Sequence, residues 1–179
     1  MKILRVTDEA RLQRAEALYM EAFPKSERKP WALIVGKQLE GSMEILAIED
    51  DENSFLGLAV FAFDKDLALL DYFAISAEFR GQGAGSEAIR ALQKRYADKR
   101  FLLEIETTKK PCDDLTMREQ RKAFYLRNGL HVMNFDVLLF GVEMEILSNC
   151  EHLTFEEYLD IYLHACSPKF KDKILKLEH

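Results

Sequence analysis

Three short apolar runs, separated by polar clusters of hairpin length, constrain this chain most. The runs lie at residues 45–48, 55–63 and 67–75, and the clusters between them are rich in aspartate. Apolar runs of this length that are bounded by turn residues predict β-strands. Because the connections are too short for a crossover, consecutive strands should pair antiparallel. We therefore expect an antiparallel meander in this part of the chain.

The pattern changes after the meander. A segment with three glycines at 80–86 leads into a helical pattern at 87–96, and another strand is predicted at 101–106. A strand, helix, strand order implies a right-handed crossover with locally parallel pairing. With a first strand at 3–6 and two more at 130–140 and 142–147, the sequence predicts an α+β fold. Its mixed, mostly antiparallel central sheet of about seven strands should be flanked by helices.

Local signals mark where the other helices begin and end. Thr7 and Asp8 are N-cap candidates, Gly41 and Gly129 are C-terminal signals, and capping boxes are predicted to begin at Thr116 and Thr154. The segment after Pro168 alternates lysine with apolar residues, which is typical of either a docked arm or a solvated end.

Composition limits the classes of function. The 179 residues suit one domain of ordinary size, and a net charge of −6 disfavours a general nucleic-acid binder. No apolar run is long enough to span a membrane. The three cysteines lack the spacing of a zinc or redox motif, so we expect a reduced, cytoplasmic protein. Residues 177–179 resemble the start of a purification tag, and His179 is given no role.

The most informative string is Arg80-Gly81-Gln82-Gly83-Ala84-Gly85-Ser86. Glycines between a strand and a helix let backbone N–H groups converge at the helix N-terminus, where an anion is favoured. An arginine at the start of the string adds a charge suited to phosphate. The alternative is a glycine-rich turn without a ligand. The spacing fits neither the Walker loop nor the dinucleotide fingerprint, which disfavours ATP and NAD.

This string resembles the Arg/Gln-x-x-Gly-x-Gly/Ala pyrophosphate loop of the GNAT superfamily of acetyl-CoA-dependent N-acetyltransferases. The string Phe124-Tyr125-Leu126-Arg127-Asn128-Gly129-Leu130 is similar to a second signature of that family. Ala77 departs from the family, where many members have proline. The resemblance implies an acetyltransferase domain at 1–147 and a C-terminal helical extension of the same domain at 148–179.

The resemblance also implies a site for acetyl-CoA. Backbone groups of Phe73 and Ile75, at the end of the predicted strand at 67–75, would pair with the pantetheine amides. The acyl arm would lie where that strand splays from the strand at 101–106. The pyrophosphate would be held by Arg80, Gly81, Gln82, Gly83, Ala84, Gly85 and Ser86.

Two side chains are candidates for catalysis. Glu104 resembles the family glutamate that serves as a base, although it could also be a solvated or paired carboxylate. Tyr125 would donate to the departing sulfur of CoA, and its alternative is an aromatic packed beside Phe124. Glu106 is a weaker candidate base.

Several features bear on the acceptor and on partners. The acidic charge favours a cationic acceptor, and the carboxylates Asp71 and Glu49 are reserve candidates to bind it, or else satisfied sheet residues. An aromatic stripe at Phe155, Tyr158 and Tyr162 suggests a homodimer if it is exposed.

The leading hypothesis is an enzyme that moves an acetyl group from acetyl-CoA to a primary amine by direct attack in a ternary complex, without a metal. The acceptor would be a small amine, a polyamine or a peptide amine. The alternative is a CoA-binding regulatory or interaction module without turnover. No nucleic acid or membrane partner is expected.

Overall fold

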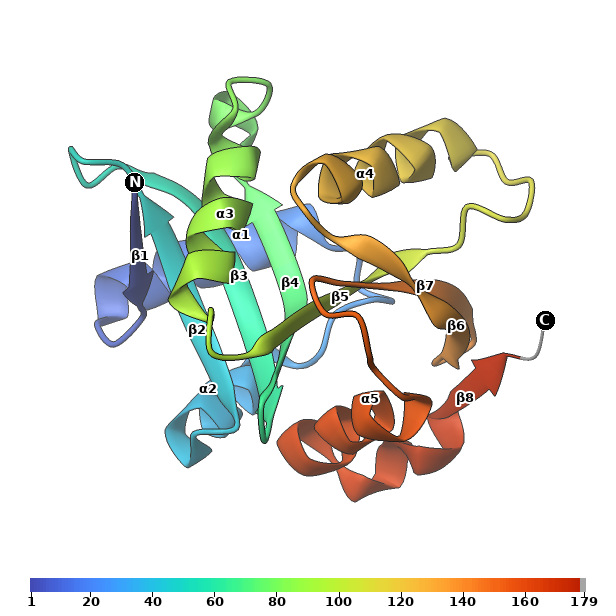
Figure 1. Ribbon diagram of the computed structural model, residues 1–179. Coiled ribbons are helices and arrows are strands. Elements are labelled where there is room, and N and C mark those ends of the chain that lie inside the picture. Colours follow the sequence, from blue (N-terminus) through green and yellow to red (C-terminus); the bar gives the residue numbers. More distant parts are fainter. Residues whose placement is uncertain (178–179) are drawn as a thin grey trace. The chain divides into compact units, whose positions relative to one another are not determined.

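The protein has a mixed α+β fold in which helices flank a mostly antiparallel sheet. The computed structural model describes residues 1–177 (Figure 1). Within these residues, hydrogen bonds order eight strands as β1-β2-β3-β4-β5-β7-β6-β8. The predicted fold class is confirmed, with one strand more than the sequence indicated. No helix in this described part of the chain has the length and apolar character needed to cross a membrane.

The chain forms two compact units. Unit 1 comprises residues 1–62 and 70–95, and unit 2 comprises residues 63–69 together with the chain from residue 96 onward. The turn of the β3–β4 hairpin thus belongs to unit 2, although most of both strands belongs to unit 1. The predicted division into 1–147 and 148–179 stays a prediction.

Unit 1 contains the predicted meander. Strand β2 pairs antiparallel with both β1 and β3, and β4 follows β3 in the sheet. The elements that contribute to this unit are β1 (Lys2–Arg5), α1 (Glu9–Ala22), α2 (Trp31–Glu40), β2 (Met43–Glu49), β3 (Phe55–Asp64), β4 (Leu67–Ile75), a 3₁₀ turn (Ala77–Phe79) and α3 (Ala84–Arg95).

Helix boundaries in unit 1 follow the local signals. The Asp8 carboxylate accepts a hydrogen bond from the Arg11 backbone N–H at 2.9 Å and caps α1. Helix α2 ends at Gly41, whose φ of 84° is the left-handed conformation that glycine adopts without strain. Both boundary predictions are confirmed.

Gly57 permits a close approach of β3 and β4. A Cβ atom built at this position would lie 2.4 Å from the carbonyl oxygen of Ala74. Just beyond it, the Ser76 N–H donates to the Leu56 carbonyl at 2.9 Å. The absence of a side chain at residue 57 therefore sets the position of the last residues of β4, which lead into the glycine loop.

Unit 2 is built around a second antiparallel group of strands. Strand β7 pairs with β5 and with β6, and β6 also pairs with β8. The elements are β5 (Arg100–Glu106), α4 (Leu115–Arg127), β6 (His131–Leu139), β7 (Val142–Ser148), α5 (Phe155–Ile161), a π-helical turn (Tyr162–Cys166), a 3₁₀ segment (Pro168–Lys173) and β8 (Ile174–Leu177).

Helices α4 and α5 lie on opposite sides of the strands of unit 2 (Figure 1). The capping box at Thr154 and Glu157 is present at the start of α5, as predicted. The box predicted at Thr116 is wrong, because α4 begins at Leu115 and Thr116 lies inside the helix. The preceding Asp114 pairs with Arg118 at 2.9 Å, and its side chain does not cap the helix.

The C-terminal segment is an integral part of unit 2. Arg100 at the start of β5 forms ion pairs at 2.8 Å with Asp66 and with Glu157 of α5. Beyond Pro168 the chain docks as β8 against β6, so the interpretation as a solvated end is wrong. Leu177 lies in β8, whereas Glu178 and His179 lie outside the described residues.

The aromatic stripe of the terminal helix is not an exposed face. Tyr158 and Tyr162 have exposed fractions of 0% and 1%. The premise that this stripe is available for a second copy is therefore wrong, because its tyrosines pack within unit 2.

We predict that Gly57→Ala lowers the free energy of unfolding by about 1–3 kcal/mol, since the new methyl group overlaps a backbone carbonyl. The control is Gly36→Ala in the interior of α2, where a Cβ would meet nothing within 4 Å. This control should gain about 0.5–1 kcal/mol from its higher helix propensity. Denaturant unfolding measures both, and equal stability of the two variants would contradict the assigned role of Gly57.

Candidate active site

The glycine loop joins β4 to α3 through a left-handed backbone. Gly81 and Gly83 have φ values of 76° and 87°, which side-chain-bearing residues rarely adopt. A Cβ at either position would meet nothing within 4 Å, so the requirement for glycine comes from the backbone conformation. The sequence thus uses glycine here to turn the chain sharply into the helix.

The start of α3 offers backbone donors. The Glu87 N–H donates to the Gly83 carbonyl at 3.1 Å at the start of the helix. The first N–H groups of an α-helix point out of its N-terminal end, where an anion can accept from them. Ala84, Gly85 and Ser86 belong to this first turn rather than to the loop. The helix dipole adds partial positive charge. This geometry suits a phosphate group.

Side chains of the loop fasten it to the preceding turn. The Arg80 Nε donates to the Ile75 carbonyl at 2.8 Å, and the Gln82 amide donates to the Glu78 carbonyl at 2.9 Å. No ion pair joins Arg80 to a carboxylate of the described residues, so its charge is not neutralised there. Phe73 is half-buried and Ile75 is buried. These loop and strand candidates lie together in unit 1.

Glu104 lies on β5 in unit 2, opposite Ile146 of β7. Its Oε1 atom accepts hydrogen bonds from the hydroxyls of Tyr158 at 2.5 Å and Tyr162 at 2.7 Å. The carboxylate is thus engaged by two residues of the terminal helical segment. Sequence reasoning identified these tyrosines only as part of an apolar stripe, although their spacing of four residues places both on one helical face.

Tyr125 lies on α4, also in unit 2, and is buried. Burial raises the pKa of its hydroxyl to about 12, with a smaller opposing effect of Arg121. Its ring packs edge-on against Phe124 with centroids 5.0 Å apart. Within residues 1–177, no protein group accepts a hydrogen bond from this hydroxyl. Tyr125 is therefore a neutral donor over the whole physiological pH range.

A buried ion pair fixes the helix that carries Tyr125. Glu145 of β7 is fully buried and accepts hydrogen bonds from Lys122 of α4 and from the backbone and hydroxyl of Thr108. Burial alone would raise the pKa of Glu145, but the bonds from Lys122 and Thr108 outweigh it and lower that pKa. Local sequence patterns gave no signal of this pair, since its residues come from separate elements.

The other candidate carboxylates are already paired. Asp71 receives both of its hydrogen bonds from the ammonium group of Lys29, at 2.6 and 2.8 Å. Glu49 is bound by Arg11 at 2.7 Å, and Glu106 by Arg118 at 2.8 Å. Asp71 and Glu49 are thus satisfied sheet residues, which was one of the two alternatives for them.

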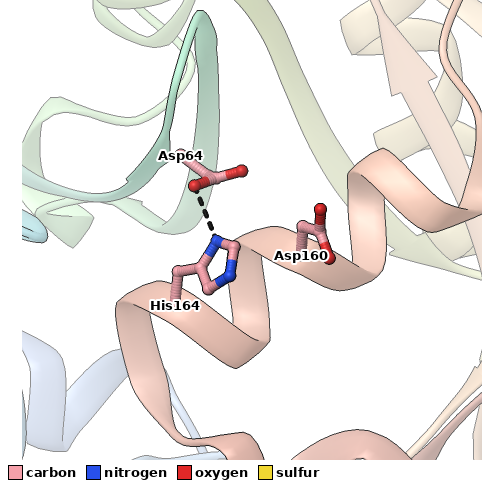
Figure 2. Close-up of side chains that lie close together, drawn as sticks. All are labelled: Asp64, Asp160 and His164. Carbon is pink, nitrogen blue, oxygen red and sulfur yellow. Dashed lines mark hydrogen bonds and ion pairs between the residues drawn. The ribbon is translucent and has the colours of Figure 1, made fainter.

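Asp64, Asp160 and His164 form one cluster of metal-type ligands among the described residues (Figure 2). His164 Nδ1 lies 2.8 Å from Asp64 Oδ1. The Lys65 ammonium lies 3.4 Å from Asp160 and 3.6 Å from Asp64, and these carboxylates raise the pKa of Lys65. The lysine therefore supplies the positive charge between the two acids. The cluster ties the β3–β4 turn to the terminal helical segment, and the expected independence of a metal stays a prediction.

The comparisons with known proteins agree with this fold. Residues 11–115 match the model of the acetyltransferase (GNAT) family. The chain belongs to the GNAT family of acetyltransferases. A comparison of the sequence with curated proteins found no match.

Solved structures with the same fold include three of interest. A putative GNAT acetyltransferase from Bacteroides thetaiotaomicron has a TM-score of 0.78 and 19% identity, covering 92% of this chain and 96% of that chain. Spermidine N-acetyltransferase from Vibrio cholerae, in complex with CoA and spermine, has a TM-score of 0.64 and 12% identity over 88% and 97% of the two chains. An aminoglycoside 6'-N-acetyltransferase complexed with CoA has a TM-score of 0.65 and 14% identity over 86% and 100%.

We predict that Tyr125 ionises near pH 12 rather than near its ordinary value of 10. Ultraviolet difference titration of the intact protein against Tyr125→Phe isolates this ionisation. Because the unfolded chain loses the proton first, the ionisation lowers the free energy of unfolding only as the pH rises from about 10 to 12, and contributes nothing near neutral pH. A difference signal centred near pH 10 in folded protein would contradict the assignment.

Proposed function

We propose that this protein transfers the acetyl group of acetyl-CoA to a primary amine by direct attack in a ternary complex. The observation that carries the proposal is the left-handed glycine loop at the start of α3, which suits the pyrophosphate of CoA. In this proposal Arg80 through Ser86 hold the pyrophosphate, and backbone groups of Phe73 and Ile75 pair with the pantetheine. Family membership and the CoA complexes of two structural neighbours support the same cofactor.

In this reaction the amine nitrogen attacks the thioester carbonyl. A C–N bond forms, the C–S bond breaks, and the products are an amide and CoA. An alkylammonium ion with a pKa near 10.4 costs about 4–5 kcal/mol to deprotonate at pH 7, so a carboxylate that receives the proton directly or through water assists the reaction. We assign this role to Glu104.

We assign Tyr125 to the sulfur of the departing CoA. With a tyrosine pKa of about 12 and a thiol pKa near 8.5, full proton transfer to the thiolate would be uphill by about 5 kcal/mol. A hydrogen bond from the tyrosine to the thiolate requires no proton transfer. Such a bond to a charged acceptor stabilises the thiolate by about 1.5–3 kcal/mol. The tyrosine hydroxyl therefore acts as a hydrogen-bond donor to the developing thiolate.

The acceptor is proposed to be a cationic amine. The net charge of −6 favours approach of positive ligands. Two structural neighbours are named for acetylation of spermidine and of an aminoglycoside, and both of those acceptors carry several amines. We therefore place polyamines and aminoglycosides first among the amines to be tested, ahead of peptide amines.

The test is acetyl transfer across an amine panel, with the amide detected by mass spectrometry and the CoA thiol by a colorimetric reagent. The intact protein should release one thiol for each amide formed. Tyr125→Phe should lower kcat by about 10- to 100-fold, the value of one hydrogen bond to a charged group, and leave the affinity for CoA unchanged.

Tyr19→Phe is the matched control, because it removes another buried hydroxyl, one that donates to the Lys29 carbonyl at 3.0 Å. Its kcat should equal that of the intact protein. Full turnover by Tyr125→Phe would contradict the role of Tyr125. Tight CoA binding without turnover on any amine would instead support a CoA-binding module.

A further inference from the structure

Two tyrosine hydroxyls converge on one oxygen of Glu104. The Tyr158 and Tyr162 hydroxyls donate to Oε1 from 2.5 and 2.7 Å. Both rings are almost fully buried, at 0% and 1% exposure. The donors come from a segment 54 and 58 residues further along the chain. The two hydrogen bonds to Glu104 therefore form only when the terminal helical segment is packed against β5.

The helical backbone widens at Tyr162. Helix α5 ends at Ile161 and a π-helical turn begins at Tyr162, whose carbonyl accepts from the Ser167 N–H five residues later at 2.9 Å. Such wide turns are rare and occur often at functional sites. The turn begins at the second of the two tyrosines that reach Glu104.

Packing also fixes the two rings. The Tyr158 and Tyr162 centroids lie 5.6 Å apart in an edge-on arrangement. Phe135 of β6 lies 6.1 Å from Tyr158, and Phe140 lies 6.5 Å from Tyr162. Rings held in this way keep their hydroxyls in place, so little rotational freedom is lost when they bind the carboxylate.

Hydrogen bonds to a carboxylate favour its charged form and fix its plane. Two such bonds to one oxygen stabilise the negative charge of Glu104 and fix its orientation. The acceptor that suits such a group is a protonated amine, which gains from the charge before it gives up its proton.

We propose that Tyr158 and Tyr162 are positioning residues that hold Glu104 charged and oriented toward a protonated acceptor amine. The inference rests on the proposed acetyl transfer and gives the segment after residue 147 a role in it. The tyrosines act through Glu104 and do not themselves contact the reacting atoms. A purely structural role, in which Glu104 only satisfies two buried hydroxyls, makes different predictions.

The test compares Tyr158→Phe and Tyr162→Phe in the intact protein and in a Glu104→Gln background. Each phenylalanine variant should lower kcat/KM for the amine about tenfold, with KM for acetyl-CoA unchanged. The acidic limb of its pH profile should move to higher pH, because a donor to the charged carboxylate is lost. In the Glu104→Gln background neither variant should lower activity further. Tyr19→Phe, whose hydroxyl bonds elsewhere, should leave rate and profile unchanged.

Other results would overturn the inference. Equal losses with and without Glu104→Gln, or an unmoved acidic limb, would show that the tyrosines act only on packing. If the intact protein turns over and the two phenylalanine variants have the same kcat/KM and pH profile as the intact protein, this inference is refuted while the proposed function stands.

Absence of turnover on every amine would refute the proposed function instead. In that case, NMR titration of the Glu104 carboxyl group in the free protein tests whether the two tyrosine hydroxyls stabilise its charged form. Its midpoint should lie at higher pH in both phenylalanine variants, and an unchanged midpoint would overturn the inference.

Discussion

The left-handed backbone at Gly81 and Gly83 fixes how the chain enters α3 in unit 1. It turns the chain from the 3₁₀ turn that follows β4 into α3, so that the first helical amides come immediately after the two glycines. Gly57 contributes to the same junction, because it lets the last residues of β4 lie close to β3. Three glycines that look unrelated in the sequence thus shape one structural feature, which is the place proposed for the CoA pyrophosphate.

Unit 2 depends on charged and polar contacts between segments that are distant in sequence. Arg100 joins β5 to the β3–β4 turn and to α5, and the Asp64–His164 contact reinforces the same connection. Lys122 and Glu145 hold α4, which carries Tyr125, against β7. The terminal helical segment is therefore part of this unit, and it supplies the two hydroxyls that reach Glu104.

Local patterns predicted much of the fold because strands, turns and caps depend on near neighbours. The meander, the cap at Asp8, the left-handed Gly41 and the box at Thr154 all follow from residues within a few positions of each other. The predicted capping box at Thr116 is wrong because α4 already begins at Leu115, where the preceding Asp114 pairs with Arg118 and does not cap the helix with its side chain.

What the sequence could not predict needs partners far apart in the chain. Strand β8 forms because the lysine-rich C-terminal segment pairs with the edge of β6. No local sequence pattern distinguishes such a docked strand from a solvated tail. Glu104 was identified as a candidate, but its tyrosine partners were not, because a helical aromatic stripe looks alike whether it packs on apolar residues or donates to a carboxylate. The loop candidates and the catalytic candidates were each identified from motifs, while their roles stay proposals.

We propose that the start of α3 holds the pyrophosphate of CoA. Calorimetry tests this assignment by titrating CoA, and pantetheine, which lacks the pyrophosphate, into the intact protein, Gly83→Asp and Gly141→Asp. Gly141 has a φ of 89° and open space around its Cβ position, so it matches the backbone strain of Gly83 in a hairpin of unit 2. We predict that Gly83→Asp weakens CoA binding at least tenfold and pantetheine binding little, while Gly141→Asp changes neither. Undiminished CoA affinity in Gly83→Asp would contradict it.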